Sequence, residues 1–307
     1  MRRSSRLAVA AAVTAALLCG APICRACTSF AVYSETALYG MNFDYDPAVP
    51  VRLTIEESDG TRAFHLAFVR GPRRIPRTAG MNEHGLFVAQ QELNPMVPDA
   101  PGRGPGEQCP WELYAQALAD FAAVSDVEEH LLTHQMVDCP SVTLHLLFAD
   151  PTGRAMIVEP GEDGTAVTPI ERDRIVMTNF ANCRFVNDDI DHVRGVGADR
   201  YKLAHDYIEE HFESFDVANG LELLERTSWE LTRCSMVFDP ELGEIYVALE
   251  RDFDRIFRVS LEDGTIETYS GFEEHLSWRL NRWGVPTTAL QEGRLGFFER
   301  IRGFFGR

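Results

Sequence analysis

The pattern of apolar and polar positions predicts that the N-terminal part of the chain is built from β-hairpins. Short β-prone runs at 28–32 and 37–43 are separated by a polar turn. A second pair of runs, at 51–56 and 64–69, surrounds the turn signal Asp59-Gly60. The first third of the folded chain is therefore expected to be antiparallel sheet.

Helical spacing of apolar residues occurs in two separate places further along. The first place is 111–122 followed by 127–135, the latter with Ser125-Asp126 as its N-cap. The second place is 199–212 followed by 217–225. Further strands are predicted around these helices, at 86–89, 142–149, 155–159, 175–178, 234–238, 244–249 and 256–260.

This order of elements favours one class of fold. The helices come in two groups between runs of strands, and no strand–helix–strand alternation is present. Such an order is typical of layered antiparallel sheets with helices on their outer faces, an α+β architecture. We therefore expect one domain, at 27–285.

The first 26 residues are expected to leave the mature protein. Three arginines occur within 1–6, and 7–18 is apolar or small throughout, as in a secretory signal peptide. Cys24-Arg25-Ala26 is an imperfect small-x-small cleavage signal, so cleavage would make Cys27 the first residue. A retained anchor or a lipidated cysteine fits these residues less well. The predicted localisation is exported, either periplasmic or secreted.

Charge and cysteine content narrow the function. The net charge is −18, and removal of the leader takes away four arginines and no acids, so the surface is expected to repel nucleic acid. Five cysteines remain after processing, and in an oxidising compartment four of them can pair. Cys27 is the expected odd thiol. Because neither a phosphate-binding glycine loop nor an HExxH motif occurs, no cofactor and no metal are expected.

Cys27 is the candidate nucleophile. An N-terminal cysteine carries a thiol that attacks and an α-amine, with a reference pKa near 8, that accepts its proton. A disulfide partner or a buried apolar residue is the alternative interpretation of a lone cysteine.

The sequence around Cys27 resembles a known family. CTSFAVYSETALYGMNFDYD, at 27–46, is similar to the opening of the linear-amide hydrolases of the N-terminal-nucleophile (Ntn) superfamily, which include choloylglycine hydrolases, penicillin V acylases and penicillin acyltransferases. That family opens on Cys-Thr-Ser and continues about 15 residues later with Gly-Arg-Asn-x-Asp; here the second motif is GMNFD, at 40–44. Three further segments resemble family motifs in the same order: NEHGL at 82–86, VMTN at 176–179 and ADRY at 198–201.

The resemblance implies a fold and a set of site residues. The fold would be the four-layer αββα sandwich of Ntn hydrolases, with Cys27 at the end of a central strand. Asp44 would accept hydrogen bonds from the α-ammonium or the thiol, and Asn179 would donate to the oxyanion. Arg200 would lower the thiol pKa by its charge.

The second oxyanion donor is left open by the resemblance. It implies a position near Gln91 or Glu92, with Asn94 two residues further on. Met41 departs from the family pattern, because it replaces the arginine of Gly-Arg-Asn-x-Asp. Either Arg200 alone suffices, or the substrate makes an apolar contact there, or the protein is a degenerate member.

Two segments outside these motifs have their own candidate roles. The stretch 94–110 contains five prolines and three glycines, and is interpreted as a lid or substrate loop or as a surface insertion. The tail, 286–307, is basic and amphipathic near its end. It is expected to contact a membrane surface or a neighbouring subunit of a homo-oligomer, or to pack on its own domain.

The sequence thus predicts an exported cysteine amidohydrolase that cleaves a linear amide of a small N-acyl substrate through a thioester. An acyltransferase using the same thioester is the alternative within the family. A non-catalytic exported binding protein of the same fold, and a disulfide-braced domain in which Cys27 is paired, are the alternatives outside it.

Overall fold

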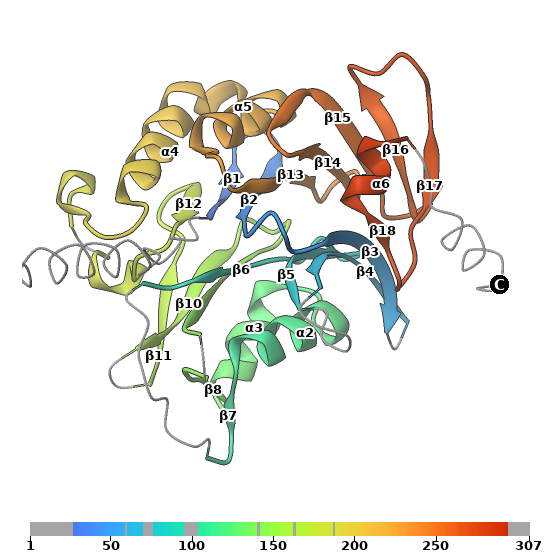
Figure 1. Cartoon of the computed structure of the whole chain (residues 1–307). Helices are drawn as coiled ribbons and strands as arrows, with labels where there is room; N and C mark the ends of the chain where they lie inside the picture. Colours follow the sequence, from blue (N-terminus) through green and yellow to red (C-terminus); the bar gives the residue numbers. More distant parts are fainter. Residues whose placement is uncertain are drawn as a thin grey trace, which may run out of the picture.

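The computed structural model describes 27–58, 60–69, 76–94, 104–139, 142–161, 164–186 and 188–293. Within these residues the chain forms four layers (Figure 1). Two eight-stranded sheets lie face to face, with one pair of long helices on the outer face of each (Figure 1). The α+β sandwich of antiparallel sheets that the sequence predicted is therefore confirmed.

The first sheet contains the strand that follows Cys27. Its order is β12-β1-β2-β13-β14-β15-β16-β17, and neighbours run antiparallel throughout. The bounds are β1 Thr28–Tyr33, β2 Ala37–Asp44, β12 Arg174–Met177, β13 Thr232–Asp239, β14 Glu244–Leu249, β15 Asp252–Ser260, β16 Thr265–Ser270 and β17 Ser277–Arg279. Helices α4, Ala198–His211, and α5, Val217–Thr227, cover its outer face (Figure 1).

The second sheet has the order β11-β10-β9-β6-β5-β4-β3-β18. The bounds are β3 Val51–Ser58, β4 Thr61–Phe68, β5 Arg77–Asn82, β6 Phe87–Glu92, β9 Leu144–Ala149, β10 Ala155–Gly161, β11 Gly164–Pro169 and β18 Val285–Pro286. Helices α2, Pro110–Asp120, and α3, Val124–Leu131, lie on its outer face. A small parallel pair, β7 Glu107–Gln108 and β8 Gln135–Met136, lies beside them.

Burial on both faces explains why the inner strands are apolar almost throughout. In β2 every residue is buried, and Tyr39, Met41 and Phe43 point into the core between the sheets. Leu38 of the same strand points the other way, into the core under α4 and α5. A sheet between a second sheet and a helical layer has no solvent face, so a simple apolar–polar alternation is lost.

Several predicted boundaries differ from the structure. The strand predicted at 86–89 is β6, Phe87–Glu92, and the turn before it begins at Glu83, directly after β5. Helix α3 begins at Val124, not at 127, and Asp126 caps it from inside the first turn by accepting the N–H groups of Ala122 and Ala123. Strands β11, β16 and β17 were not predicted, because their sequences are polar or short.

The C-terminal end of the folded body also lies further along than expected. Residue Val285 pairs with Leu53 of β3, and helix α6, Thr287–Gln291, buries Ala289 and Leu290 against the core. The domain therefore continues past 285, where the sequence analysis ended it. Most of the basic tail, 294–307, and the predicted leader, 1–26, lie outside the described residues.

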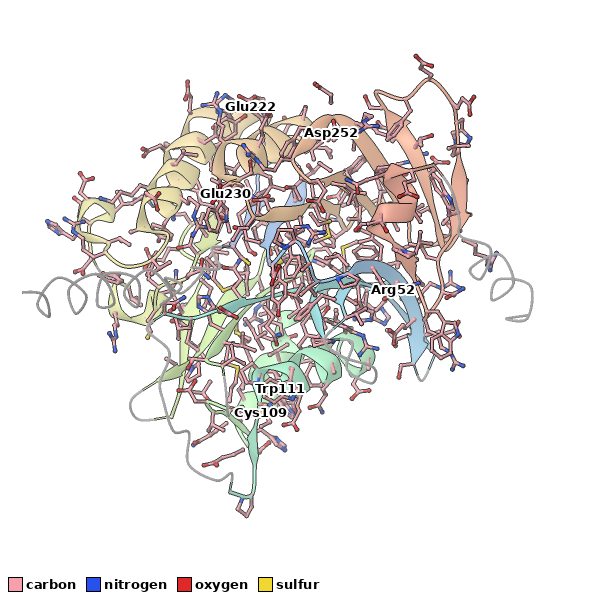
Figure 2. All side chains as sticks on the ribbon, in the orientation of Figure 1. Arg52, Cys109, Trp111, Glu222, Glu230 and Asp252 are labelled. Carbon is pink, nitrogen blue, oxygen red and sulfur yellow. A yellow bond between two sulfur atoms is a disulfide. The ribbon has the colours of Figure 1, made fainter. Side chains whose placement is uncertain are left out.

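Cysteine pairing is partly as expected. Cys109 and Cys139 form a disulfide, whereas Cys27, Cys183 and Cys234 are free thiols. The bridge fastens the start of α2, where Figure 2 labels Cys109, to the chain after β8. Glu222 on α5 marks the opposite outer layer (Figure 2). The alternative in which Cys27 is braced by a disulfide is wrong for this structure.

Candidate active site

Cys27 lies directly before β1, a strand in the interior of the first sheet. The register that pairs Thr28 with Asn42 brings Cys27 alongside Phe43 and Asp44. Its side chain is only 6% exposed and faces the core between the sheets. The Cys27 Sγ is 4.0 Å from the backbone oxygen of Asp44, the site residue at the end of β2. The structure thus brings the predicted nucleophile next to the main chain of Asp44, and the charge of the Asp44 carboxylate acts on the thiol.

Asp44 is a buried carboxyl group that is only half satisfied. Thr232 Oγ1 donates to Asp44 Oδ1 at 2.5 Å, and Oδ2 has no hydrogen-bond partner among the described residues. Burial raises the pKa of Asp44 to about 7, against the opposing effects of the Thr232 hydroxyl, the Arg200 charge and the indole of Trp229. The indole N–H lies outside hydrogen-bond geometry, so we assign it a minor effect. An acceptor is therefore free beside Cys27.

A local irregularity of the sheet places Thr232 against Asp44. The register between β13 and β2 shifts between Thr232 and Cys234, which leaves Arg233 in a β-bulge. Thr232 pairs directly with Asp44, and the guanidinium of Arg233 is held by Glu250 and by the backbone oxygen of Asp46. Nothing in the sequence around Thr232 predicts this partner, because the bulge exists only once the two strands pair.

Arg200 connects three parts of the site. It lies in the first turn of α4, and its Nη1 donates to the carbonyl oxygen of Cys27 at 2.5 Å and to Thr28 Oγ1 at 2.7 Å. Its Nη2 donates to Asn179 Oδ1 at 3.1 Å. The helix can start this close to the strand because Gly197, at φ 84°, precedes it; a Cβ there would lie 2.9 Å from Thr178 Cβ and 2.5 Å from Arg200 Nη2.

The charge of Arg200 is not the largest influence on the pKa of the Cys27 thiol. Burial, followed by the negative charge of Asp44, raises the pKa of Cys27 above its ordinary value, and Arg200 lowers it by less. The Arg200 charge thus acts in the expected direction, but burial outweighs it. A neutral thiol needs a base to become a nucleophile.

Asn179 follows β12 and contacts the end of β6 from the other sheet. Its Nδ2 donates to the carbonyl oxygen of Glu92 at 2.7 Å, and the N–H of Asn94 donates to the Asn179 backbone oxygen at 2.7 Å. An amide NH₂ group has two hydrogens, so one remains for an oxyanion. The side chain of Asn179 thus joins Arg200 to the segment where the second donor was expected.

The three candidates for that donor have different contacts. The amide of Gln91 is engaged with Ser29, and in its better orientation also with the backbone oxygen of Thr178. Glu92 presents a carbonyl oxygen, which accepts rather than donates. Asn94 is the third candidate, and the proline-rich residues that follow it, 95–103, lie outside the described residues.

Met41 replaces a cation with an apolar core residue. It is fully buried between the sheets, with Ser29 and Met236 as its cross-strand neighbours. Phe43, one pleat further along β2 and beside Cys27, stacks on Tyr45 and Phe68 with ring centroids 5.4 Å and 5.7 Å away. The surroundings of the thiol on this side are therefore apolar and aromatic.

Two motif asparagines serve the fold instead of the site. Asn42 Nδ2 donates to the backbone oxygen of Leu224, at 2.8 Å, and so joins β2 to α5. Asn82 Nδ2 donates to the backbone oxygen of Phe121, at 2.8 Å, and its Oδ1 accepts the N–H of Leu86. The motifs at 40–44 and 82–86 thus combine one site residue, Asp44, with residues that hold layers together.

Comparison with known proteins confirms the resemblance. Residues 74–220 match the sequence model of the linear amide C-N hydrolases, choloylglycine hydrolase family. This match contains Asn179 and Arg200 but begins after Cys27 and Asp44. No curated protein sequence matches the chain significantly.

Solved structures support the same fold. The chain is similar to a mutant of the conjugated bile acid hydrolase from Clostridium perfringens, with a TM-score of 0.60 and 16% identity over 83% of this chain and 97% of that one. Another variant of that hydrolase gives 0.59 and 16% over 83% and 97%. The penicillin V acylase from Agrobacterium tumefaciens gives 0.55 and 18% over 79% and 91%. At such identities these likenesses establish the fold alone.

Proposed function

We propose that this chain, which belongs to the linear amide C-N hydrolases of the choloylglycine hydrolase family, is an exported enzyme. In this proposal it hydrolyses N-acyl amides through a thioester on Cys27. The observation that carries this proposal is the free acceptor Asp44 Oδ2, buried beside Cys27. An α-ammonium on residue 27 is the group that would satisfy it.

The proposed reaction uses the two functional groups of one residue. The α-amine of Cys27 takes the thiol proton while Sγ attacks the amide carbon and forms a C–S bond. Collapse of the tetrahedral intermediate breaks the C–N bond, and the proton passes to the leaving amine. Water then attacks the thioester, gives a proton to the same α-amine, and the C–S bond breaks to restore the thiol.

The surrounding residues support this chemistry in separate roles. Asp44 Oδ2 orients the α-amine, while the second N–H of Asn179 and the side chain of Asn94 stabilise the oxyanion. Arg200 fixes the carbonyl of Cys27 and the side chain of Asn179 at the same time.

The residues beside the nucleophile also suggest the kind of acyl group. Met41, Phe43 and Tyr45 are buried and carry no charge. A substrate with an apolar acyl chain or aryl group would meet matching surfaces there, whereas a second carboxylate would find no cation at position 41. N-acyl amino acids and related small amides with an uncharged acyl part are therefore the proposed substrate class.

The decisive experiment changes the start of the chain by one residue. Protein beginning at Cys27 is expected to hydrolyse members of a panel of N-acyl amides and to show a thioester adduct by intact mass. Matched protein beginning at Ala26 keeps the thiol and Asp44 but moves the amine, and is expected to be inactive. Equal activity of the two forms would refute the proposal. Secretion of the full chain, followed by N-terminal sequencing, tests export and the cleavage position.

A further inference from the structure

A row of buried polar side chains crosses the inner face of the second sheet. Gln91 of β6 pairs in register with His145 of β9, and His145 is hydrogen-bonded to Glu159 of β10. Their exposures are 1%, 0% and 0%, in a layer that is otherwise apolar. A carboxylate so far from water is stable only when hydrogen bonds replace its hydration.

Three hydrogen bonds replace the hydration of the Glu159 carboxylate. His145 Nδ1 lies 3.0 Å from Oε1, the N–H of Asn182 donates to Oε1 at 2.9 Å, and the N–H of Cys183 donates to Oε2 at 2.7 Å. Burial alone would raise the pKa of Glu159, but the His145 hydrogen bond and the two N–H groups outweigh it and hold the pKa below its usual range. Since an ionised carboxylate only accepts, Nδ1 of His145 carries the hydrogen.

The two backbone donors belong to the turn that follows Asn179. They lie in the short 3₁₀ helix η1, Asn182–Arg184, three and four residues after Asn179. The side chain of Asn182 closes the turn from the other side, because its Nδ2 donates to the backbone oxygen of Val176 at 3.1 Å. Asn179 is therefore at the middle of a loop fixed at both ends.

From this geometry we propose that Glu159 is a positioning residue for amide hydrolysis: by holding the N–H groups of Asn182 and Cys183, it fixes the Asn179 amide at the oxyanion. Glu159 reaches the reaction only through Asn179, and the inference rests on the function proposed above. A donor to an oxyanion must be held to within about 0.5 Å of its working place. Loss of the anchor is therefore expected to weaken the transition state more than substrate binding.

Glu159→Gln tests this directly. Glutamine keeps the shape but places an NH₂ group against donors, so one hydrogen bond of the three is lost and the turn shifts. We expect the rate of Cys27 acylation in a single turnover to fall roughly ten-fold, with KM changed less than about two-fold. Alkylation of Cys27 by iodoacetamide, followed by mass spectrometry of the Cys27 peptide, forms no oxyanion and should stay within about two-fold of the wild-type rate.

Asp150→Asn is the matched control. Asp150 is also a fully buried carboxyl that accepts backbone N–H bonds, from Val124 at 2.6 Å and Thr152 at 2.8 Å. Asp150 directly follows β9, and the last residue of β9 pairs with Phe87 of β6. Because Phe87 lies four residues along β6 from Gln91, this end of the sheet is about 13 Å from Gln91. Its substitution is expected to lower Tm as much as Glu159→Gln does, without a loss of acylation rate.

Each outcome decides the inference. Unchanged acylation in Glu159→Gln, or an equal fall in acylation and alkylation, overturns it. Should Glu159→Gln not fold, Asn182→Ala removes the hydrogen bond from Asn182 to the backbone oxygen of Val176. Full activity in that variant overturns the inference equally. If iodoacetamide does not inactivate the wild-type enzyme at Cys27, the proposed function itself is wrong, which is a different result.

Discussion

Two buried carboxyl groups, Asp44 and Glu159, belong to the same molecule and have opposite surroundings. Glu159 accepts three hydrogen bonds, and its pKa lies below the usual range. Asp44 accepts one from Thr232, keeps Oδ2 without a partner among the described residues, and has its pKa raised to about 7. Glu159 is therefore a fully hydrogen-bonded structural carboxylate, whereas Asp44 lacks a donor at Oδ2 among the described residues.

The incomplete contact is informative because buried polar atoms are almost always paired in stable proteins. An unsatisfied buried carboxylate oxygen costs stability, and such costs persist where function requires them. Beside Cys27 the missing partner is a donor, and an α-ammonium supplies three. The four predictions below test this contrast, from the largest expected effect to the smallest.

Cys27→Ala should lower amide turnover by at least about 10⁴-fold, because it removes the nucleophile. Its melting temperature should be close to that of the wild type. Cys234→Ala is the control, since Cys234 is another free, buried thiol on the same sheet, across Phe43 from Cys27. Steady-state hydrolysis of the best amide of the panel should be nearly normal in that variant; activity in Cys27→Ala would move the chemistry elsewhere.

Asp44→Asn should lower kcat by roughly 10²-fold, because an amide presents N–H groups where the α-ammonium needs an acceptor. In the form that retains Ala26, the same change removes a buried charge whose Oδ2 has no partner among the described residues, so the melting temperature of that form at pH 8 should be equal to or above that of its parent. Glu159→Gln should instead lower the melting temperature. Calorimetry of the two variants measures this difference in melting temperature. An equal loss of stability in both variants would contradict the proposed difference between the two carboxyl groups.

The pH dependence of stability should differ at the two carboxyls. The folded Asp44 binds its proton more tightly than the unfolded chain, so its contribution is present below about pH 4 and is lost as pH rises through about 7. The effect is at most about 1.4 kcal/mol per pH unit in this range. Urea unfolding of the form that retains Ala26 should show it, and Asp44→Asn should abolish it; parallel curves for the two proteins would contradict the assignment.

The contribution of Glu159 to stability has the opposite dependence on pH. Its folded pKa is lower than its ordinary value, so its contribution is present above the ordinary pKa and is lost as pH falls through the folded one. In Glu159→Gln the free energy of unfolding should therefore lose less on acidification than in the wild type. This serves as the internal reference for the Asp44 experiment.

Thr232→Val should have the smallest effect. Loss of the hydroxyl that donates to Asp44 Oδ1 raises the Asp44 pKa further, because that bond favours the charged form. We expect kcat at pH 7 to fall a few-fold, roughly three- to ten-fold, and the acid limb of the pH–rate profile to move upward. Ser235→Ala, which removes a buried hydroxyl that donates to Asn42 on the neighbouring strand, should leave the acid limb in place.

Membrane contact and oligomeric state remain predictions for the basic tail. No helix among the residues that the structure describes is long and apolar enough to cross a bilayer. The described part of the C-terminal segment, up to Gly293, packs by β18 and α6 against the body.

The sequence alone determined the class of fold and the order of most elements, and it named four candidate site residues. These follow from local information: apolar spacing predicts strands and helices, and short motifs preserve Cys27, Asp44, Asn179 and Arg200 in order along the chain. It also determined that Met41 departs from the family pattern. Motif spacing, however, does not say which asparagines act on substrate and which join layers.

Only the tertiary structure decided the electrostatics and the supporting contacts. The pKa of Cys27 depends on burial, which outweighs the charge of Arg200, and burial is a property of the closed sandwich. Thr232 faces Asp44 because of a bulge in a strand 188 residues away, and Glu159 reaches the turn after Asn179 across the space between the two sheets. Such contacts arise when distant strands pair and pack, so no local pattern of residues encodes them.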